Sequence, residues 1–157
     1  MVSYVFGMIE QRLNDAVENE VSHFQIHHPL FDRDYQAQYY IKEGASLKEE
    51  IAQDSRIRAV TARCVTFGMI ASAQNSTGGK IIGIIPDSEN QVTALDSKLT
   101  QGSYFEQGSK NKAIVSERLA EKLKVKIRSK IVLTFQDTTG SIVAGAFRII
   151  GLYKTYN

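Results

Sequence analysis

The chain has 157 residues, of which 43% are hydrophobic and 23% are charged, and its formal net charge is +2. This composition is typical of a folded globular protein with one domain or two small lobes, and the charge is too small to indicate a nucleic-acid partner. The single cysteine, Cys64, excludes an intrachain disulfide and any Cys-x-x-Cys motif. No apolar run reaches the roughly eighteen residues of a membrane span, and the first residues lack the basic start of a signal peptide.

The first segment predicts an amphipathic helix that ends near residue 21. Its apolar residues recur at spacings of three and four, and the turns up to Met8 are apolar on nearly every side, whereas Glu10 to Glu20 is amphipathic. Two interpretations remain open: a helix that emerges from an apolar environment, or a surface helix whose first turns pack on the core. The residues that would be membrane-proximal are Val2, Val5, Phe6, Ile9 and Leu13.

All three histidines lie between Ser22 and Phe31, which suggests a metal site or a catalytic base. Side chains alternate along a strand, and at roughly 3.3 Å per residue His23 and His27 would be about 13 Å apart. Two ligands that each bond an ion at about 2 Å do not span that distance. We therefore expect a structural strand that buries Phe24 and Ile26 and ends before the following proline.

The next segment predicts a short strand and a short helix. Tyr39–Ile41 is aromatic and apolar, which favours a strand or a sheet edge. Ser46 and Glu49 have the spacing of a capping box, in which each side chain satisfies a free N–H of the first helical turn. We expect a helix from Leu47 to about Asp54.

A long β-hairpin follows. The segment from Ile57 to Ala73 is rich in β-branched and small residues and predicts one long strand, or two strands broken near Gly68. Residues 74–79 have turn composition, and Lys80–Ile85 predicts the returning strand, which Pro86 ends. The Asn-Ser-Thr triplet in this turn matches a glycosylation acceptor, but turns favour the same residues.

The C-terminal half has clearer signals. Asp87 to Ser109 is polar with weak helical anchors, and then a strand over Ala113–Val115 leads to Ser116, a favourable N-cap, and a helix. Two strands, Lys130–Gln136 and Ser141–Tyr153, close the chain around a four-residue turn. That turn, Asp-Thr-Thr-Gly, resembles an aspartic-protease loop, but no second copy supplies the paired carboxylate that this chemistry needs.

Five basic residues alternate with mostly apolar ones in a run that ends at the first residue of the strand Lys130–Gln136: Lys122, Lys124, Lys126, Arg128 and Lys130. Such a stripe can bind phosphates or acidic lipid head groups, so these residues are the candidate contacts for an anionic partner. The solvated face of a half-buried segment shows the same alternation, and lysines at a sheet edge also block aggregation. The chain has no phosphate loop, dinucleotide fingerprint, Gly-x-Ser-x-Gly or His-Glu-x-x-His, so we predict no catalytic residue, cofactor or metal.

The order of these pieces resembles the MacB-like periplasmic core domain of ABC-transporter permeases, especially the LolC/LolE lipoprotein-releasing branch of the FtsX-like family. The resemblance rests on Ser22–Phe31, which follows the family's Gly-His-Val-Gln-Ile-His-x-Pro-x-Phe, on Arg63, and on Gly83-Ile84-Ile85-Pro86 with Glu89. The C-terminal matches are Leu99–Phe105, Ile114-Val115-Ser116 with Leu119–Lys126, and Phe147–Gly151. Their shared order over about 130 residues carries more weight than any single motif.

The chain departs from the family pattern at three places, of which the first is Ser22, which stands where the usual residue is glycine. Arg128-Ser129 stands where the family commonly has Gly-Asp, and Tyr156 stands where a glycine often follows the threonine. Family members also usually continue with another strand-helix-strand unit, so the resemblance implies a truncated part of a larger permease. We expect an exposed strand edge that a neighbouring molecule could fill.

The resemblance implies an α+β fold with an N-terminal amphipathic helix, a strand-helix-strand (porter-like) lobe and a β-rich (sabre-like) lobe. The expected domains are residues 1–21 (membrane-proximal helix), 22–86 (first lobe with the long hairpin) and 87–157 (second, β-rich lobe). The implied function is non-catalytic: coupling of cytoplasmic ATP hydrolysis to outward movement of a lipoprotein or another amphiphile.

The resemblance also implies a location and partners. The domain would lie on the periplasmic side of the inner membrane, held by flanking helices that this chain lacks. Its partners would be a second permease subunit, a cytoplasmic ATPase, and a periplasmic chaperone or lipoprotein cargo, with no nucleic acid. Two alternatives remain: a soluble module that binds an anionic partner, including nucleic acid, through Lys122 to Lys130, and a histidine-dependent metalloenzyme.

Overall fold

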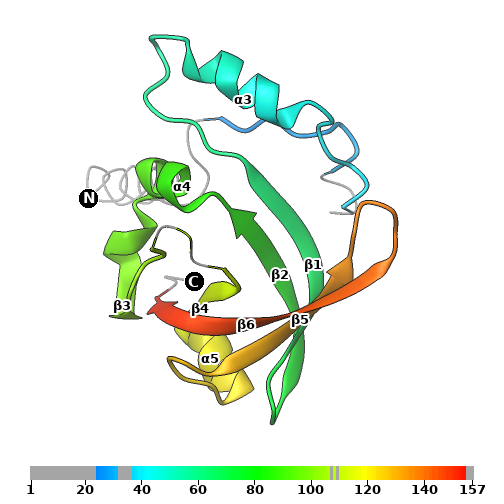
Figure 1. Cartoon of the computed structure of the whole chain (residues 1–157), viewed down its shortest axis with the longest axis vertical. Helices are drawn as coiled ribbons and strands as arrows, with labels where there is room; N and C mark the ends of the chain where they lie inside the picture. Colours follow the sequence, from blue (N-terminus) through cyan, green and yellow to red (C-terminus); the bar gives the residue numbers. More distant parts are fainter. Residues whose placement is uncertain (1–23, 32–36, 107, 109, 155–157) are drawn as a thin grey trace, which may run out of the picture.

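The computed structural model describes residues 24–31, 37–106, 108 and 110–154. Its helices are α3 (Gly44–Ala52), α4 (Pro86–Thr93), the 3-10 helix η2 (Leu95–Lys98) and α5 (Glu117–Leu123). Its strands are β1 (Arg63–Ala71), β2 (Ser76–Ile84), β3 (Leu99–Gly102), β4 (Lys112–Ser116), β5 (Lys130–Gln136) and β6 (Ile142–Tyr153). The predicted α+β class is therefore confirmed, with a curled, mainly antiparallel sheet (Figure 1). The helix expected over residues 1–21 lies outside the described residues.

One sheet joins the two halves of the chain. Its order is β2-β1-β5-β6-β3, and β4 pairs with β6 in parallel. The hairpin strand β1 pairs with β5 through Gly68–Phe135 and Ala71–Val132, so residues on both sides of position 86 share the sheet. The twelve-residue β6 pairs with β5 along its first half and with β3 and β4 along its second half. Within the described residues β2 pairs only with β1, which leaves its outer side as a sheet edge.

The core lies between α5 and the inner face of the sheet. Because side chains alternate along a strand, β5 directs Ile131 and Leu133 inward, where they meet Leu123 of α5 and Ile149 of β6. Leu123 and Ile149 are 0% exposed and Ile131 is 1% exposed, and burying such a side chain contributes about 1.5–3 kcal/mol. Figure 1 shows α5 at one end of the sheet and α3 beyond the other end.

The long hairpin is confirmed, with different boundaries. β1 continues through Gly68 without a break, and β2 begins at Ser76, so the predicted turn over residues 74–79 is wrong. The tight turn lies at residues 72–75, where the Ser72 hydroxyl accepts bonds from the N–H groups of Gln74 and Asn75. At Gly68 an added Cβ would collide with the Thr134 carbonyl oxygen, so this glycine serves close strand packing and not a break.

The helix predicted near residue 47 exists, but the capping box is wrong. α3 begins at Gly44, and its N-cap, Glu43, makes no side-chain capping bond. The N–H of Leu47 bonds the Glu43 carbonyl at 3.0 Å, so Ser46 already lies inside the first turn and cannot act as the cap. The expected strand over Tyr39–Ile41 is also absent from the described residues, because a turn at Ile41 leads directly into α3.

The expected histidine strand is wrong over its described part. Residues 24–28 have no strand pairing, and Phe24 and Ile26 are 56% and 50% exposed instead of buried. A turn closes the segment where Phe31 N–H bonds the His28 carbonyl at 2.9 Å. The alternation of apolar residues predicted that Phe24 and Ile26 would be buried in a sheet. No strand within the described residues pairs with this segment, so the two side chains stay exposed.

The elements predicted from Ala113 onward are confirmed, whereas the strand β3 within the polar segment Asp87–Ser109 was not predicted. The hydroxyl of Ser116 accepts a bond from the Leu119 N–H at 3.3 Å, which caps α5 as its sequence indicates. β5 and β6 form a hairpin whose turn is held by the Asp137 carboxylate, the acceptor for the N–H groups of Thr139 at 2.8 Å and Ser141 at 3.0 Å. The Thr139 hydroxyl donates to the same carboxylate at 2.7 Å, and this bond, followed by the backbone bonds, lowers the pKa of Asp137. The Asp-Thr-Thr-Gly residues therefore serve the turn. None of the helices in the described ranges combines the length and the apolar character needed to cross a membrane.

Candidate functional site

A buried ion pair joins the start of β1 to α4. The Nη2 atom of Arg63 lies 2.7 Å from Oε1 of Glu89, and its Nε atom lies 2.9 Å from Oε2. The two side chains are 23% and 5% exposed. This two-point geometry is the strong form of an arginine–carboxylate contact, because both bonds are charge-assisted and their directions fix the two groups.

Hydroxyl groups complete the surroundings of the Glu89 carboxylate. The Thr93 hydroxyl donates to Oε1 at 3.1 Å from the next turn of α4, and the Thr61 hydroxyl donates to Oε2 at 3.4 Å. Thr61 also contacts the Ser88 hydroxyl, to which Lys48 of α3 donates at 3.5 Å. The network, which we call the α4 junction, therefore links α3, the segment before β1, β1 itself and α4.

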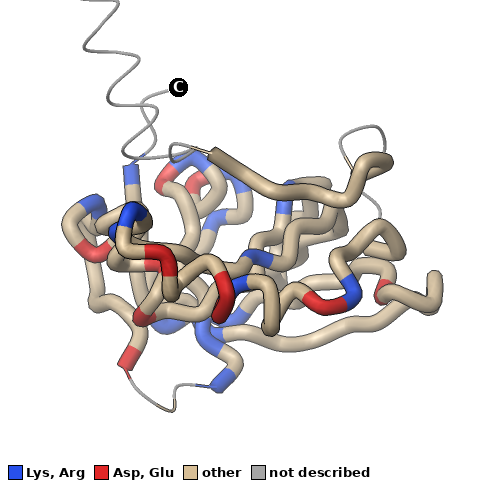
Figure 2. Tube along the Cα trace, turned by 90° about the horizontal axis from the view of Figure 1, so that it is seen from above, with Lys and Arg blue, Asp and Glu red and all other residues tan. Residues whose placement is uncertain are grey.

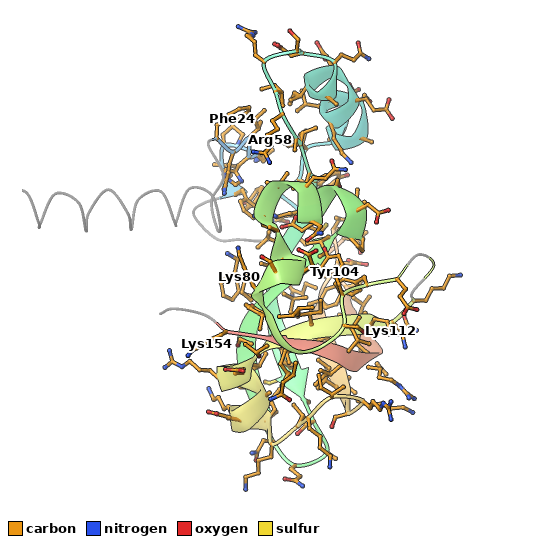
Figure 3. All side chains as sticks on the ribbon, turned by 90° about the vertical axis from the view of Figure 1, so that its left-hand side faces the viewer. Phe24, Arg58, Lys80, Tyr104, Lys112 and Lys154 are labelled. Carbon is orange, nitrogen blue, oxygen red and sulfur yellow. The ribbon has the colours of Figure 1, made fainter. Side chains whose placement is uncertain are left out.

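Tyr104 holds the start of α4 from the other side. Its hydroxyl donates to the Pro86 carbonyl oxygen at 2.9 Å, and the residue lies just below α4 (Figure 3). Burial, followed by the negative charges of Glu89, Asp96 and Asp87, raises the pKa of Tyr104 to about 12. The phenol is therefore protonated at neutral pH, and its bond to the Pro86 carbonyl oxygen adds a contact that holds the start of α4.

Two glycines lie where β3 and β6 approach each other, just before Tyr104. Gly102 has a φ of +86°, and a Cβ added to it would collide with the Ile150 carbonyl oxygen. Across the ladder, a Cβ on Gly151 would lie 3.0 Å from the Ser103 carbonyl oxygen. Since Ser103 N–H bonds the Ile150 carbonyl at 3.0 Å, β3 and β6 approach closely just before Tyr104.

The histidine segment borders an open hollow of about 460 Å³ beside α3, lined by Ile26, His27, His28, Pro29, Gln38, Tyr40, Ile41, Lys42 and Leu47. The two described histidines use their rings for stacking: His27 lies 5.4 Å from Phe31 and His28 lies 5.5 Å from Tyr39, centroid to centroid. His28 Nδ1 also accepts the Leu30 N–H at 3.2 Å. Within the described ranges, no three His, Cys, Asp or Glu side chains group as metal ligands.

The five residues of the basic stripe are all exposed, while the residues between them pack in or against the core or are partly buried. The structure divides them: Lys122 lies in the last turn of α5, Lys124 is its C-cap, and Lys130 begins β5. The alternation is therefore that of a half-buried connection with a solvated face. Lysines and arginines occur in many parts of the trace and are interspersed with acids (Figure 2).

Arg128 has an unusual backbone conformation. Its φ is +72°, in the left-handed region that favours glycine, and its N–H bonds the Ile149 carbonyl at 2.8 Å. This is the position at which the resembled family commonly carries glycine. The positive φ is a property of the backbone at this position, and in this chain a residue with a side chain adopts it.

No family model matches the chain, and no curated protein matches it. The predicted membrane-proximal residues Val2, Val5, Phe6, Ile9 and Leu13 lie outside the described residues. The Arg63–Glu89 pair and the Tyr104–Pro86 bond were not predicted. The signal was there in part, because an arginine at the start of a β-branched strand and a glutamate after Ile-Ile-Pro are both expensive to bury alone.

Proposed function

We propose that this chain is an extracytoplasmic part of an ABC-transporter permease of the MacB-like, FtsX-like type. It is non-catalytic in this role, and it transmits the energy of cytoplasmic ATP hydrolysis to the outward movement of a lipoprotein or another amphiphile. A separate subunit hydrolyses the ATP, and a second permease subunit completes the transporter. The domain lies on the periplasmic side of the inner membrane.

The observation that carries this proposal is the convergence of the resemblance residues. Arg63 and Glu89 are 26 positions apart and come from two separate motifs, yet they form the bidentate pair of the α4 junction. Pro86, from the second motif, accepts the bond of Tyr104, from a third motif. Residues from three separate motifs of the resemblance therefore bond to one another in the fold.

Arg128 adds independent support. A family glycine at this position implies a backbone with positive φ, and the chain has φ +72° there despite the substitution. The physical requirement of the motif is thus retained where its residue type is not. This agreement concerns the local fold and does not depend on side-chain similarity.

The proposed role requires a body that transmits force without deforming. The α4 junction meets this requirement because it ties α3, β1 and α4 by charge-assisted and hydroxyl bonds. β6 extends the connection, since it pairs with β5, β3 and β4 along its length. A displacement applied near β1 would therefore reach the far end of the sheet.

The neighbouring sequence provides the first test. The proposal expects hydrophobic spans of about twenty residues flanking this chain in its gene, and a phosphate-loop ATPase encoded beside it. A complete gene without such a span upstream of Met1 would reject the permease role. The second test is co-purification from detergent-solubilised membranes: the full-length product should retain the ATPase, and its absence from a stable preparation counts against the proposal.

A further inference from the structure

The register of three neighbouring strands places three cations side by side. Lys130 of β5 is the direct antiparallel partner of Arg148 of β6, and Arg148 is also the parallel partner of Lys112 of β4. Direct partners point to the same face of a sheet, and their Cα atoms are about 4.5–5.5 Å apart. We call these three residues the cation row.

The cation row lies on the outer face of the sheet. Its strand neighbours Ile131 and Ile149 belong to the core, so alternation directs Lys130 and Arg148 away from it, and both are exposed. Within the described residues no ion pair is made by Lys112, Lys130 or Arg148. Like charges directly opposite one another are destabilising, so an anion bound across the row would relieve a repulsion that the free protein carries.

No acidic residue occupies this face of β1, β2, β5 or β6. The register gives its positions as Arg63, Val65, Phe67, Met69, Ala71, Ser76, Gly78, Lys80, Ile82, Ile84, Lys130, Val132, Thr134, Gln136, Ile142, Ala144, Ala146 and Arg148. Beside the cation row the next pair is Val132 and Ala146, and Val132 is 41% exposed. The face is therefore cationic at the row and apolar next to it.

This pattern points to an anionic amphiphile. We propose that the cation row binds the phosphate head groups of an anionic phospholipid surface, with the apolar strip at Val132 and Ala146 against the acyl boundary. The inference goes beyond the permease role and does not depend on it. The row shares only Lys130 with the basic stripe of the sequence, because Lys112 and Arg148 join it through pairing alone.

Other occupants fit less well. A second copy docked through the same face would bring cations against cations with no acid to offset them. A nucleic-acid strand repeats its charge along its length, whereas the cations here end after one row and are followed by apolar residues. Lys80 of β2 lies on the same face of the sheet, but it does not extend the row. The sheet curls, so that Lys80 and Lys112 lie on opposite sides of the molecule (Figure 3).

The test is co-sedimentation of the purified chain with vesicles. Binding is expected to phosphatidylglycerol vesicles, to weaken with added salt, and to be absent for phosphatidylcholine vesicles. Each cation near an anionic surface contributes about fivefold to binding, so the double variant K130E/R148E should lose at least ~25-fold. The conservative variant K130R/R148K should bind as the parent does.

The matched control is K122E/K124E, which makes the same change in net charge at the end of α5, against the opposite face of the sheet. It should retain binding within about threefold, because neither lysine belongs to the row on the outer face of the sheet. A similar loss in both double variants would overturn the site and leave net charge as the cause. Lys112→Gln provides a third, milder variant if the unfolding midpoint of K130E/R148E falls.

Two further results would overturn the proposal. One is binding of inorganic phosphate, followed by calorimetry, without binding of the phosphatidylglycerol vesicles, which would assign the row to a free anion. The other is retention on polyglutamate or on a single-stranded oligonucleotide but not on the vesicles, which would assign it to an acidic macromolecule. Vesicle binding that is lost only in the row variants supports the phospholipid.

Discussion

Arg63 and Glu89 meet through two bonds of 2.7 and 2.9 Å although 26 positions separate them in the chain. The Glu89 side chain is 5% exposed, so its carboxylate depends on Arg63 and on two threonine hydroxyls for the hydrogen bonds that water would otherwise donate. The pair is thereby a fixed point between the hairpin and α4. Removing one partner leaves a buried charge unpaired, which destabilises the fold more than removing both partners does.

We expect Arg63→Met to lower the free energy of unfolding by about 3 kcal/mol, because it leaves a buried carboxylate without its cation. The double variant R63M/E89M should recover part of this loss, since no charge then remains buried. Urea denaturation of R63M, E89M and the double variant measures the coupling. The exposed pair Asp54 and Arg56 is the control, and Asp54→Asn should change stability little. Equal losses at both pairs would contradict the structural role of burial.

Gly102→Ala should destabilise the protein more than Gly140→Ala does. Both glycines have positive φ, +86° and +84°, so both substitutions carry a backbone cost of about 1 kcal/mol. Only at Gly102 would the new Cβ collide with a backbone oxygen, which adds about 1–3 kcal/mol. Thermal unfolding of the two variants isolates the collision. Similar midpoints would mean that β3 and β6 separate easily at this point.

Raising the pH from about 10 to 12 should destabilise the folded state through Tyr104. Its pKa is raised to about 12 in the fold, so the neutral phenol is favoured there; the contribution is complete below the ordinary pKa of about 10 and is lost as pH rises through the folded value. Tyr104→Phe should cost about 1 kcal/mol at pH 7 for the lost bond to Pro86. Its stability should then fall less steeply between pH 10 and 12 than that of the parent. Parallel slopes would show that the phenol does not titrate with unfolding.

Arg128→Gly should stabilise the protein by about 0.5–1 kcal/mol. Glycine removes a left-handed penalty of about 1–2 kcal/mol, and the greater freedom of glycine in the unfolded chain offsets part of this gain. Arg128→Ala removes the same charge but keeps the penalty, so it is the matched control and should give no gain. Guanidinium denaturation of the three proteins distinguishes them. A gain in both variants would assign the effect to charge instead of backbone.

Local signals were sufficient where residues act on their own neighbours. Ser116 caps the helix that follows it, and Asp137 holds the turn that it begins, so both elements could be predicted from short stretches. The failures involve distant partners. Phe24 and Ile26 had the alternation of a buried strand, yet burial requires a neighbouring strand that no local pattern specifies.

The same reasoning explains what was missed at the candidate sites. Arg63 and Glu89 each belong to a motif of the sequence, but their contact depends on the hairpin, because β2 ends beside the start of β1 and α4 follows β2 directly. The basic stripe was visible as a spacing, whereas the cation row exists only because pairing register sets Lys112 and Lys130 on either side of Arg148. Register is a property of the assembled sheet, and a one-residue slip would send these side chains to the other face.

The turn between β1 and β2 supports the end of α5, and Asn75 tests this contact. Asn75 Nδ2 donates to the Lys122 carbonyl oxygen at 2.9 Å, and the Ser72 hydroxyl donates to the Leu123 carbonyl oxygen at 2.8 Å. These carbonyl groups belong to the last turn of the helix, which has no partners of its own for them. Asn75→Ala should therefore cost about 1 kcal/mol.

Asn75→Asp should cost about 1.5–2 kcal/mol, because it replaces the donor with a negative charge at the negative end of the helix dipole. Gln74→Glu makes the same change from amide to carboxylate one residue earlier, and the side chain of Gln74 makes no hydrogen bond within the described residues, so this variant should stay close to the parent. Lowering the pH through the ordinary aspartate pKa of about 3.9 should narrow the difference between the two variants, since a protonated carboxyl group at position 75 can donate again. Urea unfolding at pH 7 and pH 3.5 measures both effects, and equal stability of the two variants at pH 7 would show that the turn does not support α5.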